Sequence, residues 1–209
     1  MNACFISYRH PGNKRTTEIL RKLADELEAR ICLHVPGARA YFDLERLEVG
    51  DRYQEELATE LCRSACMVLF FNRSYFDVTN HFCAREYRAM IELEKRRLGS
   101  AASDLQRKGL ILTVAIRDPE NLPAEITAHR QFVDVSGLML SPNYFKQTKW
   151  LTKLDEIAKA VADRYSIVSK ALGATPDNCP DFRLPPFSDI ESWLRGVVDS
   201  YPPVTMPGH

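Results

Sequence analysis

The sequence predicts an α/β fold in which five mainly parallel strands form an open, flavodoxin-like sheet with helices on both faces. Short apolar runs alternate along the chain with segments whose apolar residues recur every three or four positions, as strands alternate with helices in such folds. The runs at 65–71 and 109–116 are apolar almost throughout, which is typical of parallel strands buried on both faces. A chain of 209 residues suits one such domain with an extension.

The expected elements follow from apolar spacing and from helix-capping residues. The first helix repeats Ile19, Leu23, Leu27 and Ile31 every fourth residue, and a second helix begins at the capping residue Asp51. The strands expected are 3–7, 40–43, 65–71, 109–116 and 132–136, and the main helices are 14–33, 51–61, 80–98 and 150–165, with a short one near Ala124. Right-handed crossovers between parallel strands fix most of the topology.

The chain divides into a domain at 1–168 and a Pro-rich C-terminal extension at 169–209. Prolines crowd the extension, and one helical fragment at 190–198 interrupts it. We expect the extension to lie on the domain or to contact a partner. For the residues after Ser200, plain disorder is an equal alternative.

Composition points to an ordinary soluble globule. Hydrophobic residues make up 45% of the chain and charged residues 27%, and the formal net charge is zero. This balance gives no reason to expect nucleic acid or an anionic membrane as a partner. The sequence shows no export signal and no apolar run of the ~20 residues that span a bilayer. We therefore expect a cytoplasmic protein.

The six cysteines lack CxxC pairing. Because cytoplasmic thiols stay reduced, we interpret them as buried free thiols. A zinc set of Cys62, Cys66, His81 and Cys83 matches no common spacing. We therefore expect no metal and no bound cofactor.

Ligands of open parallel sheets bind beyond the carboxyl ends of the strands, so the loops at 7–13, 43–51 and 72–80 are the candidate site. The helix after the third strand places Glu86 on its apolar side, with Phe82, Met90 and Leu93. An ionised acid is costly to bury without a partner. Two interpretations stay open: Glu86 pairs with a nearby arginine at the rim, or it faces a cationic ligand.

Three segments together resemble the TIR (Toll/interleukin-1 receptor) domain family, and specifically its bacterial members. They are CFISYRH on the first strand, YFDLERLEVGD across the second strand and its loop, and ACMVLFFNRSYF followed by FCAREY. The resemblance covers roughly residues 1–168. It supports the five-stranded fold expected above and adds a function.

The resemblance implies that Glu86 is the catalytic residue, four positions after the aromatic Phe82. The family more often has tryptophan at that aromatic position, so Phe82 keeps a stacking face and loses an indole donor. The remaining substrate-binding residues implied are Ser7, Tyr8, Arg9, His10, Phe42 and Asp43. The loop at 43–51 corresponds to a mobile segment that gates the pocket and joins subunits, and its assembly residues are Leu44, Glu45, Arg46, Leu47 and Gly50.

The activity that the resemblance implies is NAD⁺ glycohydrolysis, with NAD⁺ as substrate rather than cofactor. The products would be nicotinamide and ADP-ribose, or a cyclic ADP-ribose. Such enzymes act in bacterial anti-phage immunity when they self-associate, and we expect a separate sensor protein to trigger that assembly.

Two alternatives stay open: a non-catalytic adaptor acting by TIR–TIR contacts, and another enzyme on the same sheet, such as a nucleoside transferase. The chain has no GxGxxG, P-loop or GxSxG motif that would indicate a Rossmann dehydrogenase, an NTPase or a serine hydrolase.

Overall fold

The computed structural model describes residues 1–9, 14–42, 51–98, 109–130, 132–139, 146–172 and 179–201. Within these residues a single sheet is formed by five strands in the order β2-β1-β3-β4-β5, and every neighbouring pair is parallel. The strands are β1 (Asn2–Tyr8), β2 (Ala40–Phe42), β3 (Ser64–Phe71), β4 (Ile111–Ala115) and β5 (Phe132–Asp134). The predicted α/β fold with a five-stranded parallel sheet is confirmed.

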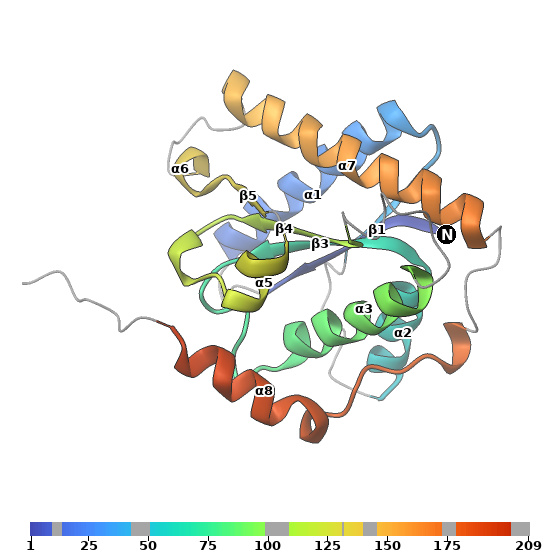
Figure 1. The fold of residues 1–209 in the computed structure, drawn as a ribbon. Coiled ribbons are helices and arrows are strands. Elements are labelled where there is room, and N and C mark those ends of the chain that lie inside the picture. The colour runs from blue at the N-terminus through green and yellow to red at the C-terminus, as the bar shows by residue number, and fades with distance from the viewer. Residues whose placement is uncertain are drawn as a thin grey trace, which may run out of the picture.

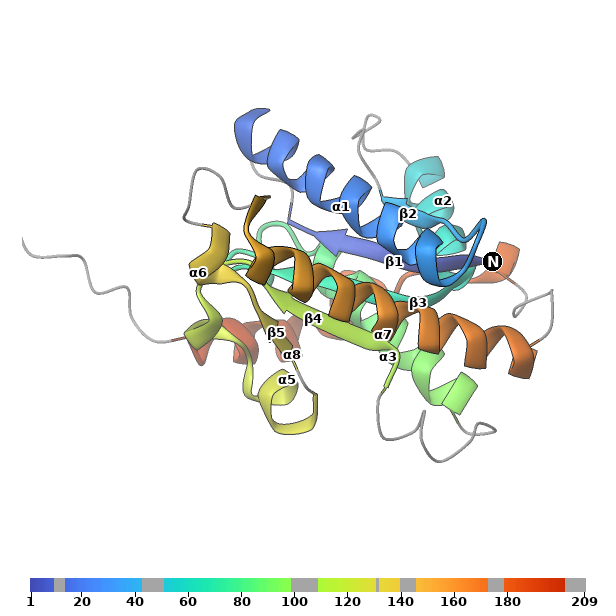
Figure 2. The same ribbon diagram turned by 90° about the horizontal axis from the view of Figure 1, so that it is seen from above.

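Helices cover both faces of this sheet (Figures 1 and 2). One face carries α1 (Lys14–His34) and α7 (Thr148–Leu172), and the other carries α2 (Asp51–Cys62), α3 (Phe82–Leu98) and α8 (Phe187–Asp199). The short helical elements are η1 (Pro119–Asn121), α5 (Ala124–His129), α6 (Ser136–Met139) and η3 (Cys179–Asp181).

Alternate residues of the central strands point to opposite faces, because side chains along a strand alternate. Phe5, Leu69 and Phe71 pack in the cluster beneath α2, α3 and α8. Ile6 and Val68 pack in the cluster beneath α1 and α7. Both strands are therefore buried on both faces, and Ser7, two residues after Phe5, lies on the α3 side.

The last long helix is longer than its sequence pattern predicts. We expected a helix at 150–165, whereas α7 runs from Thr148 to Leu172. Val168 continues the buried stripe of this helix beyond Tyr165, and it is 1% exposed. The predicted start of the extension at residue 169 thus falls inside α7, although the domain boundary itself stays a prediction.

Beyond α7, the described residues 179–201 of the C-terminal extension lie on the domain. Phe182, Leu184, Ile190, Leu194 and Val197 are buried in the same cluster as α2 and α3. The indole of Trp193 stacks on Tyr87 with ring centroids 5.9 Å apart and donates a hydrogen bond to the Glu125 carboxylate. Figure 1 shows α8 lying alongside α3, so this segment contributes to the core.

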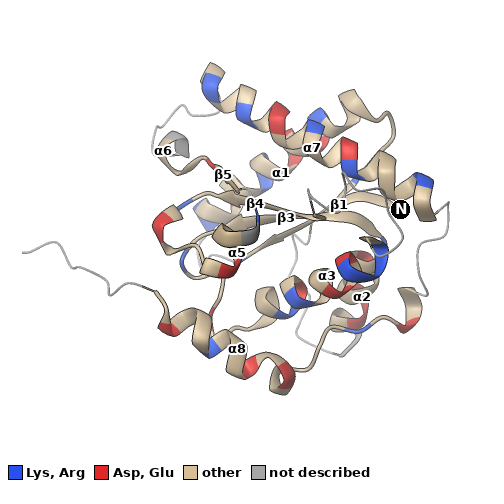
Figure 3. Cartoon of the chain, viewed as in Figure 1, with Lys and Arg blue, Asp and Glu red and all other residues tan. Residues whose placement is uncertain are grey.

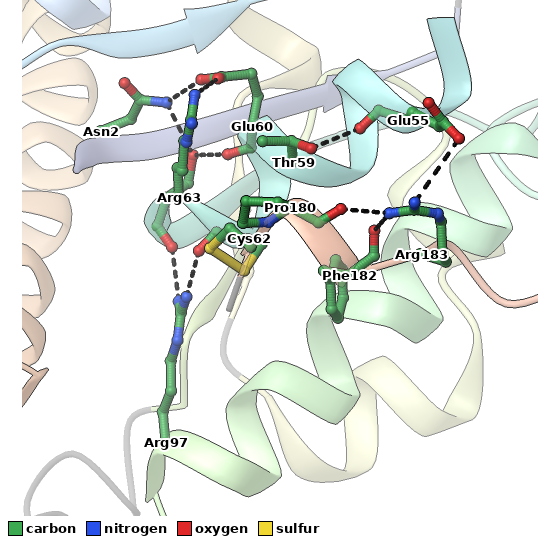
Figure 4. Close-up of a disulfide and its surroundings, with 12 residues drawn as sticks. Asn2, Glu55, Thr59, Glu60, Cys62, Arg63, Arg97, Pro180, Phe182 and Arg183 are labelled. Atoms are coloured by element: carbon green, nitrogen blue, oxygen red, sulfur yellow. Dashed lines mark hydrogen bonds and ion pairs between the residues drawn. A yellow bond between two sulfur atoms is a disulfide. The ribbon is translucent and has the colours of Figure 1, made fainter. Parts of the chain in front are cut away.

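The expectation of free thiols is wrong for two of the six cysteines. Cys62 at the end of α2 and Cys179 in η3 form a disulfide, with their Cα atoms 5.4 Å apart and a sequence separation of 117 (Figure 4). Packing of the C-terminal segment against α2 brings the two sulfurs together, and no spacing rule in the sequence could indicate that. Cys4, Cys32, Cys66 and Cys83 take no part in a disulfide.

Charged residues of both signs lie on the helices, and the strands carry almost none (Figure 3). This distribution is what a two-face hydrophobic core requires, because unpaired charges are costly to bury. Among the described residues, no helix combines the length and apolar character that crossing a bilayer requires.

Replacing Cys179 by serine tests how strongly the disulfide stabilises the fold. The Cys179→Ser variant should lose about 3 kcal/mol of unfolding free energy, because the cross-link no longer restricts the unfolded chain. Chemical denaturation without reductant measures this loss. Dithiothreitol should lower the unfolding free energy of the wild type to that of the Cys179→Ser variant. Cys32→Ser is the matched control, since Cys32 is free. Equal midpoints for the two variants would contradict a stabilising disulfide.

Candidate active site

The candidate site lies at the carboxyl end of β1, on the face of the sheet that α3 covers. The parallel register pairs Ser7 with Leu69 of β3, so Ser7 lies on an interior strand of the sheet, one residue before β1 ends. Its side chain is 1% exposed. A hydroxyl buried this deeply needs a hydrogen-bond partner.

That partner is Glu86, the residue that the sequence singled out. Ser7 Oγ donates a hydrogen bond to Glu86 Oε2 at 2.5 Å. Glu86 lies in the second turn of α3 and is 7% exposed. The structure thus explains the acid on an apolar helix face, because the hydroxyl of β1 lies opposite it.

A third group, the phenol of Tyr75, completes this arrangement, and the predicted site residues did not include it. Tyr75 lies in the loop between β3 and α3, is fully buried, and its hydroxyl is 2.6 Å from Ser7 Oγ. Burial raises the pKa of this phenol well above its usual range, and the nearby Cys83 and Glu86 raise it further. The signal available in the sequence was a phenol placed just after a buried strand.

Arg9 and Asp77 form an ion pair at the rim of the site. Arg9 Nη2 lies 3.3 Å from Asp77 Oδ2, and the two side chains are 20% and 30% exposed. Burial alone would raise the pKa of Asp77, but hydrogen bonds from Thr79 and the charge of Arg9 outweigh it and lower that pKa. Arg9, which was predicted to contact substrate, is thus held at the rim by the Asp77 carboxylate.

Phe82 begins α3 next to the C-terminal segment. The ring of His81 stacks on Phe82 at 5.6 Å and on Phe187 of α8 at 4.3 Å. Arg85 lies over Phe82 and donates a hydrogen bond to the Pro185 carbonyl at 2.6 Å. Burial and the charge of Arg85 lower the pKa of His81, which favours the neutral ring in this stack.

Two predicted aromatic residues lie on the opposite face of the sheet. The rings of Tyr8 and Phe42 pack against each other at 4.8 Å within the cluster beneath α1 and α7. The backbone of Tyr8 still connects to the site, because its carbonyl accepts a hydrogen bond from the thiol of Cys83. The structure therefore groups Ser7 with Glu86 and separates both from the rings of Tyr8 and Phe42.

The remaining predicted residues lie outside the described part of the chain. They are His10 and Asp43 of the expected substrate contacts, and Leu44, Glu45, Arg46, Leu47 and Gly50 of the expected assembly loop.

Two other charged residues on the inner side of α3 have structural partners. Glu94 pairs with Arg130 through hydrogen bonds of 2.7 and 2.9 Å and accepts one from the Leu110 amide. Arg97 donates to the carbonyls of Cys62 and Ser64, beside the disulfide (Figure 4). Both residues join α3 to backbone at the far end of the sheet, whereas Glu86 lies at the strand ends where ligands bind.

A comparison of Glu86→Gln with Glu94→Gln separates a functional carboxylate from a structural one. Glu94→Gln should lose about 2 kcal/mol of unfolding free energy, because it leaves the Arg130 charge partly buried without its partner. Glu86→Gln should stay within about 1 kcal/mol of the wild type, because the amide oxygen still accepts from Ser7. Urea denaturation at neutral pH measures both. Equal losses would assign Glu86 a structural role instead.

A family model described as TIR domain matches residues 4–138, which is more than half of the chain. A search for similar sequences among curated proteins finds no match. The match includes β1 from Cys4 onward, the other four strands, and both residues of the Ser7–Glu86 hydrogen bond. The chain therefore belongs to the TIR domain family.

Proposed function

We propose that this protein cleaves the nicotinamide–ribose bond of NAD⁺ and that Glu86 is the catalytic residue. The TIR domain family includes both NAD⁺-cleaving enzymes and adaptors that act only as scaffolds. The observation that supports the enzyme is the burial of a carboxylate at the strand ends, in hydrogen-bond contact with Ser7. Scaffolding by surface contacts does not require such a group.

The reaction suits a single carboxylate. As the glycosidic bond breaks, its electron pair moves to the pyridinium nitrogen, so nicotinamide leaves neutral and the ribose gains oxocarbenium-like positive charge. No second acid has to protonate this leaving group, unlike the case of ordinary glycosidases. Water then bonds to the ribose carbon and releases a proton, or an adenine nitrogen takes its place and gives a cyclic product.

The electrostatic contribution of Glu86 is large enough to matter. At about 4 Å and an effective dielectric constant near 20, attraction between the carboxylate and the ribose cation is worth roughly 4 kcal/mol. That corresponds to about a thousandfold in rate. The donated hydrogen bond of Ser7 favours the charged form of the carboxylate that this role requires.

The other predicted substrate contacts are proposed roles for residues around this carboxylate. Phe82, one turn before Glu86 on the same helix, would stack on substrate by giving up its contact with His81 or Arg85. Arg9 would bind the dinucleotide phosphates by exchanging its contact with Asp77 for one with substrate. Tyr8 and Phe42, whose rings pack together on the other side of β1, would contact substrate from that side.

Self-association is the proposed means of activation. In the enzymes that this chain resembles, a neighbouring subunit completes the pocket, and the segment at 43–51 is the part proposed to make that contact. A separate sensor protein would trigger the assembly, as part of bacterial anti-phage defence.

The decisive experiment measures NAD⁺ turnover by the purified protein at high concentration with a crowding agent. Glu86→Gln should lower the rate of nicotinamide release about a thousandfold, as followed by chromatography of nicotinamide, ADP-ribose and cyclic ADP-ribose. Glu92→Gln makes the same change at an exposed position of the same helix and should leave turnover unchanged. Turnover that persists in Glu86→Gln would contradict the proposal, and no turnover by any protein would favour the scaffolding role.

A further inference from the structure

We propose that Tyr75 is a positioning residue that acts on Glu86 through Ser7. This inference rests on the proposed function, because it concerns how the catalytic carboxylate is held. Three oxygens from three separate elements lie in a row: Tyr75 OH in a loop, Ser7 Oγ on β1 and Glu86 Oε2 on α3, with successive distances of 2.6 and 2.5 Å. All three side chains are buried.

Hydrogen counting fixes the direction of both hydrogen bonds. An ionised carboxylate only accepts, and a serine hydroxyl has one hydrogen to donate. When Ser7 donates that hydrogen to Glu86, its oxygen must accept the hydrogen of Tyr75. Because burial keeps the phenol protonated, Tyr75 always has a hydrogen to donate. Tyr75 therefore donates to Ser7, and Ser7 donates to Glu86. Each hydrogen bond polarises the next and strengthens it.

Tyr75 can position Ser7 because its own ring is fixed. The ring packs edge-to-face against Phe76 at 4.9 Å and lies 6.4 Å from Phe71 of β3. Its backbone amide donates to the Asn72 carbonyl at 2.9 Å, which holds the turn after β3. A serine hydroxyl by itself rotates among staggered positions, so a fixed donor at its oxygen leaves one of them favourable.

The consequence is a carboxylate held in place before substrate arrives. Catalytic groups contribute most when neighbouring side chains hold them within a fraction of an ångström of the productive geometry. Ser7 makes the contact with Glu86, and Tyr75 selects the rotamer in which Ser7 makes it. Loss of the phenol hydroxyl alone should therefore lower the rate of the chemical step more than it lowers substrate binding.

Steady-state kinetics with a double-mutant cycle tests this order of action. Tyr75→Phe keeps the ring and should lower kcat about tenfold with KM within about twofold. Ser7→Ala should cost at least as much, and adding Tyr75→Phe to Ser7→Ala should cost nothing further. Tyr87→Phe is the matched control, since it removes the hydroxyl of another buried tyrosine, adjacent to Glu86 in sequence. Independent, multiplicative losses in the double variant, or equal losses in Tyr75→Phe and Tyr87→Phe, would overturn the proposal.

A second measurement does not depend on turnover and leaves Tyr75 intact. In protein labelled with ¹³C at tyrosine Cζ, Ser7→Ala and Glu86→Gln should both shift the Tyr75 resonance, assigned with Tyr75→Phe. The shift caused by Glu86→Gln should disappear in the Ser7→Ala background, because the effect passes through Ser7. A Tyr75 chemical shift that is unchanged in Glu86→Gln would overturn the proposal. If the wild type lacks NAD⁺ turnover while these shifts appear, the proposed function fails and the positioning of Glu86 stands.

Discussion

The pairing of β1 with β3 is the constraint on which both the core and the candidate site depend. These strands form the middle of the sheet, and each is covered by helices on both faces. Their parallel register brings the carboxyl end of β1 beside the loop that follows β3. A residue of β1, a residue of that loop and a residue of the next helix can therefore meet, and Ser7, Tyr75 and Glu86 do so.

Helix α3 has two ends with different roles. Toward its C-terminus, Glu94 and Arg97 join the helix to Leu110, just before β4, and to the start of β3 by hydrogen bonds to backbone groups. Toward its N-terminus, Glu86 contacts a side-chain hydroxyl at the strand ends. The C-terminal contacts fix the helix on the sheet. The N-terminal part of the helix is thereby held where Glu86 can accept the hydrogen bond of Ser7.

The segment at 179–201 adds core contacts to the part of the chain that the family model matches. It lies beyond residues 4–138, yet it buries Ile190 and Leu194 against the same helices that carry the site. It also contacts the start of α3 directly, through the hydrogen bond from Arg85 to Pro185 and the stack of His81 on Phe187. The position of Phe82 in this chain is therefore set partly by residues outside the family match.

The sequence by itself determined the order of the elements, the parallel sheet and the place of Glu86 on the apolar side of its helix, because apolar periodicity and an acid on an apolar helix face are local signals. Tertiary structure decided which groups meet. The Cys62–Cys179 disulfide, the hydroxyl of Tyr75 beside Ser7 and the placement of Tyr8 and Phe42 on the other face depend on contacts between distant segments. Such contacts follow from strand register and from the docking of the C-terminal segment, which no local pattern specifies.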